Sequence, residues 1–113
     1  MFKLSLNRIH DTVRITEGTD ALTLTVNADP NRLVAGLKQA QAALSAITDE
    51  TTPEDVQKAA EYFADVIFGE EQRKQLFEFY RNDAGCVINI CGRYFAEGLK
   101  KKIVKAQKKV KSK

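Results

Sequence analysis

The chain has 113 residues, of which 43% are hydrophobic and 29% charged, so its size and composition are those of one soluble globular domain. No stretch approaches the ~20 consecutive apolar residues that a membrane-spanning helix needs. Residues 1–20 contain no continuous apolar run of the secretory-signal type.

The charge is unevenly distributed along the chain. The formal net charge is +3, but residues 100–113 hold eight lysines and no acid. Residues 1–99 therefore carry ten basic and fifteen acidic groups, a net charge of −5. The sequence therefore consists of an acidic region, residues 1–99, followed by a basic C-terminal segment. We expect a single domain over residues 1–113 whose last residues, 105–113, form a frayed basic tail.

Residues 2–27 have the pattern of β-structure. Apolar and polar side chains alternate with a period of two, which is typical of half-buried strands; the apolar members are Phe2, Leu4, Leu6, Val13, Ile15, Leu22, Leu24 and Val26. The run Glu17-Gly18-Thr19-Asp20 is typical of a turn. The pattern predicts an antiparallel hairpin, or a three-stranded meander if residues 2–6 pair as a separate strand.

Two helices follow, each with a recognisable start. Asp29-Pro30 and Thr52-Pro53 both place a capping residue before a proline. Apolar residues then recur at spacings of three and four, which predicts one helix ending near Thr48 and another ending at Gly69.

The remaining sequence predicts two more helices. Glu70 and Glu71 place acids at the start of the third, and Asn82-Asp83 with Gly85 are expected to end it. The last helix should begin near Cys86 and run to about residue 110. Its apolar residues have helical spacing; they are Val87, Cys91, Tyr94, Phe95, Leu99, Ile103, Ala106 and Val110. Gly92 within this helix suggests close approach of another backbone.

Cys86 and Cys91 are the only cysteines. Five residues apart on a helix, their Cα atoms would lie roughly 8–9 Å apart, beyond the ~7 Å limit for a disulfide. We interpret both as buried free thiols in a reducing cytoplasm.

The sequence offers little for catalysis, metals or cofactors. His10 is the only histidine, and a lone histidine in a strand is usually a surface residue. The cysteines and His10 match no zinc spacing, and no phosphate-binding glycine motif occurs. Glu70-Glu71 is explained by the helix dipole. We therefore expect no catalytic, metal-binding or cofactor-binding residues.

Partner binding fits the sequence better. Aromatic side chains concentrate between residues 62 and 95, and a domain this small cannot turn all of them inward. Together with the apolar stripe of the last helix, they suggest a docking surface for another protein. The candidate contact residues are Phe68, Phe79, Tyr80, Tyr94, Leu99 and Ile103.

Residues 63–80, FADVIFGEEQRKQLFEFY, and 86–109, CVINICGRYFAEGLKKKIVKAQKK, resemble the small tail assembly chaperones of long-tailed bacteriophages and prophages. The shared features are a short N-terminal β segment, an F-G-x-E-Q-like junction between helices and a lysine-rich end. The resemblance covers under half of the chain, and the N-terminal part matches only in general layout.

The resemblance implies a non-enzymatic protein that acts in the cytoplasm of the bacterial host and is absent from the finished virion. Such proteins bind the tape measure protein, keep it soluble and help to recruit tail tube proteins. In many phages the gene also yields a longer product by frameshifting, and the codons of Lys100–Lys102 or Lys108–Lys109 would allow a slippery run.

The sequence thus predicts an α+β fold in which a small antiparallel hairpin or meander, within residues 2–27, packs on three to four helices spanning 30–110. The alternative function is a small nucleic-acid-binding regulator that uses the lysines of residues 100–113. That segment lacks arginine for base recognition and aromatic residues for stacking, so nucleic acid is the less favoured partner. A monomer and a homo-oligomer are equally compatible with the sequence.

Overall fold

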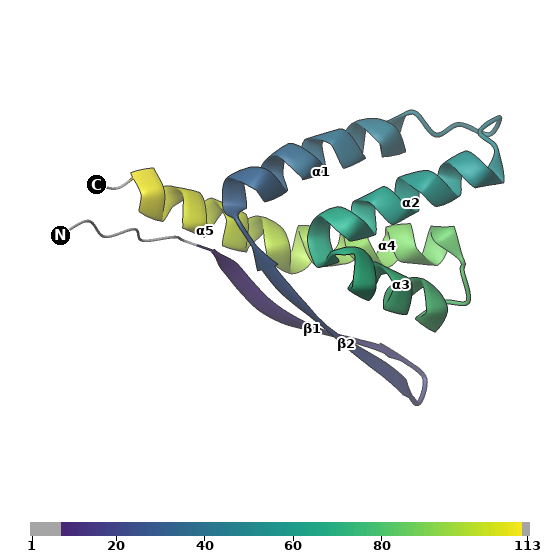
Figure 1. The fold of residues 1–113 in the computed structure, drawn as a ribbon, viewed down its shortest axis with the longest axis horizontal. Helices are drawn as coiled ribbons and strands as arrows, with labels where there is room; N and C mark the ends of the chain where they lie inside the picture. The colour runs from purple at the N-terminus through teal and green to yellow at the C-terminus, as the bar shows by residue number, and fades with distance from the viewer. Residues whose placement is uncertain (1–7, 112–113) are drawn as a thin grey trace.

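The computed structural model describes the backbone of residues 8–111 and the side chains of residues 8–106. Within this range the fold is α+β: a two-stranded antiparallel hairpin packs against four helices. Figure 1 shows the hairpin crossing one side of the helical layer, with its tip extending past the helices. No helix of residues 8–111 combines the length and apolar character needed to cross a membrane.

The hairpin consists of β1 (Ile9–Glu17) and β2 (Asp20–Ala28), paired from Ile9 opposite Ala28 to Glu17 opposite Asp20. Its two-residue turn places Gly18 at φ +62°, a left-handed conformation that glycine adopts without strain. The face toward the helices buries Ile9, Ile15, Leu24 and Val26. The predicted hairpin is confirmed for residues 9–28, whereas Phe2, Leu4 and Leu6 lie outside the described residues.

Helices α1 (Pro30–Ser45) and α2 (Pro53–Phe68) begin at the predicted prolines. The Thr52 side chain caps α2 by accepting a hydrogen bond from the Asp55 N–H at 3.2 Å, whereas the Asp29 side chain makes no capping bond to α1. Helix α1 ends at Ser45, before the predicted end near Thr48. Gly69, at φ +86°, ends α2 as predicted.

Helix α3 (Glu70–Phe79) is followed by a reversal in which Arg81 and Asn82 both have positive φ. The break at Asn82-Asp83 is therefore confirmed, but Gly85 takes no part in it. Helix α4 (Ala84–Tyr94) already includes Gly85, because the Asp83 side chain accepts a hydrogen bond from the Cys86 N–H at 3.1 Å and starts the helix two residues before the predicted position.

The predicted last helix passes through a π-helical turn that the sequence analysis missed. Helix α4 continues through η1 (Phe95–Leu99) into α5 (Lys100–Lys111). Cys91 and Leu99, both fully buried, are eight residues apart, which in a regular α-helix turns them about 80° from each other. A wider turn accommodates one extra residue and returns Leu99 to the buried side.

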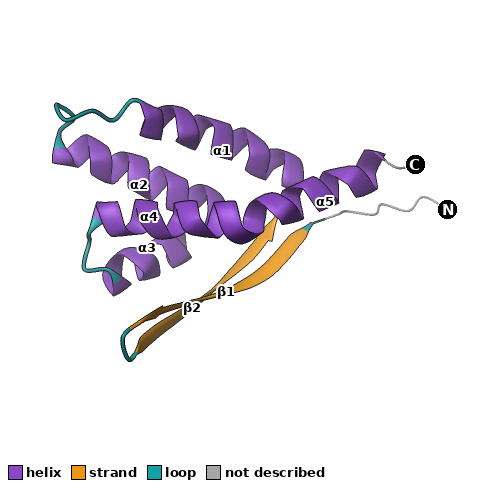
Figure 2. Cartoon of the chain, turned by 180° about the vertical axis from the view of Figure 1, so that it is seen from behind, coloured by secondary structure: helices purple, strands orange, loops and turns teal. Residues whose placement is uncertain are grey.

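One core joins the hairpin to all the helices. Cys91 lies in it, but Cys86 is exposed, so the prediction that both thiols are buried is wrong for Cys86. Close helix packing occurs at Gly36, where a Cβ atom would lie 2.9 Å from Val66 Cγ1. It does not occur at Gly92, where a Cβ atom would meet nothing within 4 Å, because that side of α4 is open. Figure 2 shows α4 and α5 following each other across the back of the molecule.

Candidate functional site

A groove separates the distal half of β1 from α4 and η1. One wall is the continuous run 13–17 of β1, and the other comes from α4 and η1; the cavity measures about 360 Å³. The side chains of Ile15 and Phe68 are buried in it, and those of Val13, Ile90 and Tyr94 are half-buried. Exposed charged side chains stand around these apolar groups: Arg14, Glu17, Arg93 and Glu97. We call this feature the β1–α4 groove.

A second cavity, of about 410 Å³, continues the β1–α4 groove toward the tip of the hairpin. Glu17, Tyr80, Ile90 and Arg93 line both cavities. Because one strand and one helix border both, the two cavities form a single elongated depression. Its shape suits an extended chain better than a small compact ligand.

Aromatic rings give the depression its apolar surface. Phe68 stacks on Tyr94 with ring centroids 5.9 Å apart and planes inclined by 24°. Phe79 meets Tyr80 edge to face at 5.1 Å and 87°. Half-buried tyrosines of this kind offer apolar area and a polar tip, a combination enriched at protein interfaces.

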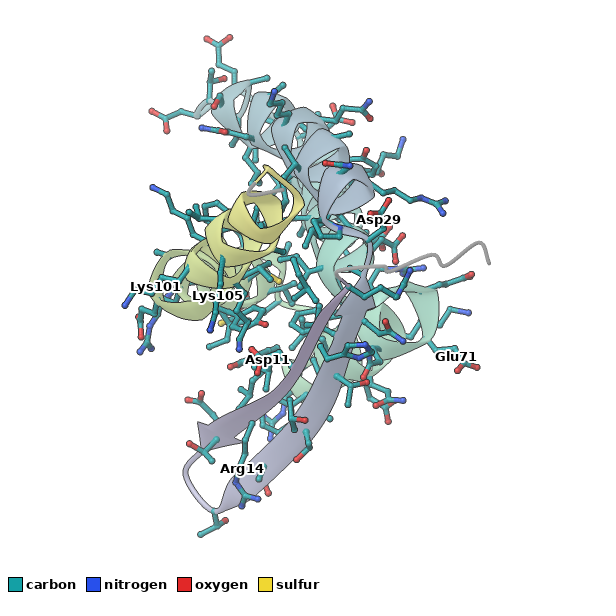
Figure 3. The ribbon with its side chains drawn as sticks, turned by 90° about the vertical axis from the view of Figure 1, so that its left-hand side faces the viewer. Asp11, Arg14, Asp29, Glu71, Lys101 and Lys105 are labelled. Atoms are coloured by element: carbon teal, nitrogen blue, oxygen red, sulfur yellow. The ribbon has the colours of Figure 1, made fainter. Side chains whose placement is uncertain are left out.

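The base of the hairpin is tied to the last helix by a small polar cluster. The Tyr94 hydroxyl donates a hydrogen bond to Asp11 Oδ2 at 2.7 Å, and Lys102 Nζ lies 3.9 Å from Asp11 Oδ1. Figure 3 shows Asp11 on the side of the hairpin that faces α5. These contacts connect β1 to α4 and α5, the helices on either side of η1, and so fix one end of the β1–α4 groove.

The electrostatic surroundings keep the tyrosines neutral. Burial, the hydrogen bond to Asp11 and the charge of that carboxylate all raise the pKa of Tyr94. Burial and the charge of Glu17 raise the pKa of Tyr80. Neither hydroxyl is therefore prepared to act as a base or nucleophile near neutral pH. The groove offers binding surface.

The structure brings together four of the six predicted contact residues. Phe68, Tyr80 and Tyr94 line the β1–α4 groove, and Phe79 lines its extension with Tyr80. The other two are elsewhere: Leu99 is 0% and Ile103 6% exposed. Phe68 is itself only 8% exposed. The expectation of an exposed surface at Phe68, Leu99 and Ile103 is therefore wrong: Phe68 is buried at the end of α2, and Leu99 and Ile103 face the core from η1 and α5.

Sequence reasoning missed the residues that complete the depression. The alternation of residues 2–27 assigns Val13 and Ile15 only to the sheet, and no sequence motif marks Ile90, Arg93 or Glu97. The signal was present in part, since Ile90, Arg93 and Glu97 recur at spacings of three and four on one helix face. What was missing was the position of β1 beside that face.

The described residues form no recognisable site for a metal ion or for catalysis. No group of three or more His, Cys, Asp and Glu side chains there could hold a metal ion. His10 is exposed on the outer face of β1. A further cavity, of about 440 Å³, lies between the base of the hairpin and α1, and its lining includes Arg8, Arg32, Asp29 and Asp65. Its opposing charges select no particular ligand.

The described lysines of α5 form an exposed basic surface. Lys100, Lys101, Lys102 and Lys105 are exposed, whereas Leu99, Ile103 and Ala106 of the same helical segment are buried. Lys101 and Lys105 lie on the opposite side of the molecule from Glu71 (Figure 3). None of these four lysines is among the lining residues of the β1–α4 groove or its extension.

The comparisons with known proteins add no further constraint to this site. No protein-family model matches the chain, and no curated protein or solved structure matches it at a significant level.

Proposed function

We propose that this chain is a non-enzymatic tail assembly chaperone of a long-tailed bacteriophage or prophage. It binds the tape measure protein and helps to recruit tail tube proteins. It acts in the bacterial cytoplasm and is absent from the finished virion. The proposal extends the resemblance of residues 63–80 and 86–109 to those chaperones.

One observation supports assigning client binding to a particular surface. The segments that bear the resemblance supply most of the β1–α4 groove and its extension, including Phe68, Tyr80, Ile90, Arg93 and Tyr94. An apolar depression surrounded by charges of both signs provides binding area for an aggregation-prone client and keeps the chaperone soluble. We assign the client contact to Phe79, Tyr80, Ile90 and Arg93.

The test is co-expression of the full chain with the neighbouring tail genes, capture from nuclease-treated lysate and identification of the captured proteins by mass spectrometry. We expect recovery of a very long helix-rich protein or of a tail tube protein. Tyr80→Ala should lower recovery by about tenfold, the equivalent of ~1.4 kcal/mol of binding.

The matched control is Tyr62→Ala. Tyr62 is an exposed aromatic residue on α2 that lies outside the groove and donates a hydrogen bond to Gln39 Oε1 at 2.6 Å. It should leave recovery unchanged. Equal recovery with folded Tyr80→Ala and Tyr62→Ala proteins would reject the assigned surface, and failure to recover any tail protein would reject the chaperone proposal.

A second candidate function, nucleic-acid binding, is favoured by the exposed lysines of α5. Each phosphate contact would contribute about 0.9 to the salt slope of log K. Replacing Lys101 and Lys105 by Glu should then abolish retention on a nucleic-acid column at low salt. The chaperone proposal expects client recovery to survive both substitutions and moderate salt.

A further inference from the structure

The two outer edges of the hairpin differ in how their backbone groups are occupied. On β2, the Gln72 side chain from α3 accepts a hydrogen bond from the Thr25 N–H at 2.7 Å and donates one to the Thr25 C=O at 2.6 Å. An amide side chain thus replaces a neighbouring strand at the centre of that edge. An added strand therefore cannot pair with Thr25 at the centre of the β2 edge.

The register of β1 and β2 also shows which residues of β1 direct their backbone N–H and C=O groups away from β2. Thr12 lies opposite Thr25, so outward-directed groups fall at every second residue from Thr12. The Thr12 N–H donates to Asp11 Oδ1 at 2.9 Å. Among the described residues, the backbone N–H groups of Arg14 and Thr16 have no acceptor. The open edge is therefore the stretch 13–17, the strand wall of the β1–α4 groove.

The chain itself contains a strand-like segment of matching length. Residues 2–6, FKLSL, place Phe2, Leu4 and Leu6 on one face of an extended chain and Lys3 and Ser5 on the other. The phase differs from that of β1, because the apolar residues of 2–6 are even-numbered and the inward residues of β1 are odd-numbered. The segment therefore has the pattern of a separate strand rather than of a straight continuation of β1.

The same copy cannot place this segment along the open edge. The Arg8 side chain is held beside Asn27, with Nε 2.7 Å from Asn27 Oδ1 and Nη2 3.1 Å from the Asn27 C=O. From Arg8, Leu4 can reach about 14 Å, but Val13 lies about 17 Å along the strand. Only one residue separates Leu6 from Arg8, and a strand reversal needs at least two.

We propose that residues 2–6 of a second copy of this chain lie in the β1–α4 groove as an added strand on β1. Lys3 and Ser5 then exchange backbone hydrogen bonds with Thr16 and Arg14, while Phe2, Leu4 and Leu6 cover Ile15, Ile90 and Tyr94. Reciprocal exchange gives a two-fold symmetric dimer. The dimer does not depend on the proposed client, but a client that binds in the groove must displace the segment.

The test is the molar mass of the purified full chain in light scattering over a wide range of concentration. We expect twice the 12.7 kDa chain mass. Leu4→Asp should give the monomer because it places a charge among the apolar groove side chains, whereas Ser5→Asp, one residue away, should leave the dimer intact. A monomer for the unmodified chain, or a dimer unaffected by Leu4→Asp, would overturn the proposal.

A second pair of variants tests the edge itself. Thr16→Pro removes an N–H that lies outside the hairpin ladder and should dissociate the dimer; Thr23→Pro makes the equivalent change on the β2 edge and should not. Circular dichroism verifies that each variant is folded. If Thr23→Pro dissociates the dimer and Thr16→Pro does not, the contact lies on β2 and the proposal is overturned.

Amide exchange supplies a readout that distinguishes the source of the added strand. The Arg14 and Thr16 amides should be protected, and their protection should rise with protein concentration and disappear in Leu4→Asp. Protection that is independent of concentration in a monomer would mean pairing within one copy and would overturn the exchange.

Discussion

Tyr94 connects the hairpin to the last helix through a single hydroxyl group. Its ring stacks on Phe68 and its hydroxyl donates to Asp11 Oδ2. Asp11 also accepts from the Thr12 N–H and lies near Lys102. Removing the hydroxyl therefore removes one bond without leaving the carboxylate unpartnered.

We expect Tyr94→Phe to lower the free energy of unfolding by about 1.5–3 kcal/mol, the range for a hydrogen bond to a charged group. Urea unfolding measures it. Tyr62→Phe removes an exposed tyrosine bond to Gln39 and should cost less than about 0.5 kcal/mol. Equal losses in the two variants would contradict a special role for the Asp11 bond.

The pH dependence of stability has a defined sign at this residue. The folded-state pKa of Tyr94 is raised, so its contribution is present below the unfolded value of about 10 and is lost as the pH rises through the folded value. The free energy of unfolding should therefore fall above about pH 10. The fall should be smaller in Tyr94→Phe.

The two thiols should differ in reactivity. Cys86 is exposed, whereas burial raises the pKa of Cys91 to about 12. An aromatic disulfide reagent at pH 8 should label one thiol per native chain and two in urea, and Cys86→Ser should leave no native labelling. Rapid native labelling of Cys91 would contradict its burial.

Because the Cys91 pKa is raised, its contribution to stability is lost as the pH rises from about 9 to about 12.

At the scale of elements, α3 holds the hairpin in place through Gln72. The side chain bonds the Thr25 N–H, the Thr25 C=O and the Phe68 C=O. It thus joins β2 to the end of α2.

We expect Gln72→Ala to lower the free energy of unfolding by about 1–2 kcal/mol, because it removes three hydrogen bonds while water replaces the lost partners of the exposed Thr25 in part. The control is Gln75→Ala, an exposed position on the same helix, which should change stability by less than about 0.5 kcal/mol. Amide exchange at Thr25 should accelerate only in the first variant. Unchanged exchange at Thr25 would show that Gln72 does not protect this amide.

Two glycines in helices should respond to alanine in opposite directions. At Gly36 a Cβ atom would lie 2.9 Å from Val66 Cγ1, whereas at Gly92 it would meet nothing within 4 Å. Gly92→Ala should stabilise by up to ~1 kcal/mol through helix propensity. Gly36→Ala should destabilise by about 1 kcal/mol because the branched Val66 side chain cannot easily turn away.

Thermal unfolding measures both changes, and Val66→Ala provides the check on the second. If the clash is the cause, the loss due to Gly36→Ala should be smaller in the Val66→Ala background. If Gly36→Ala lowers the stability equally in both backgrounds, the clash with Val66 is not the cause.

At the scale of the whole molecule, the hairpin and helices share one core. We therefore expect a single cooperative unfolding transition. Far-ultraviolet circular dichroism, which reports the helices, should coincide in urea with tyrosine fluorescence, which reports in part the Tyr94 contact with the hairpin. A fluorescence transition that precedes loss of the helices would show a separately unfolding hairpin.

The sequence by itself determined the elements that have strong local signals. Alternation and the Gly18 turn predicted the hairpin, and Pro30, Thr52-Pro53 and Gly69 marked helix ends correctly, because turn and capping preferences act within a few residues. The aromatic excess also predicted Phe79, Tyr80 and Tyr94 as contact candidates, and these three residues line the depression.

Only the tertiary structure decided which helix faces and strand edges are exposed to a binding partner. The π-helical turn at Phe95–Leu99 directs Leu99 and Ile103 inward, and the crossing of β1 past α4 creates the groove from segments about 80 residues apart. Gln72 occupies the centre of one sheet edge over a separation of 47 residues. Such features depend on packing between distant segments, which local propensity and periodicity do not encode.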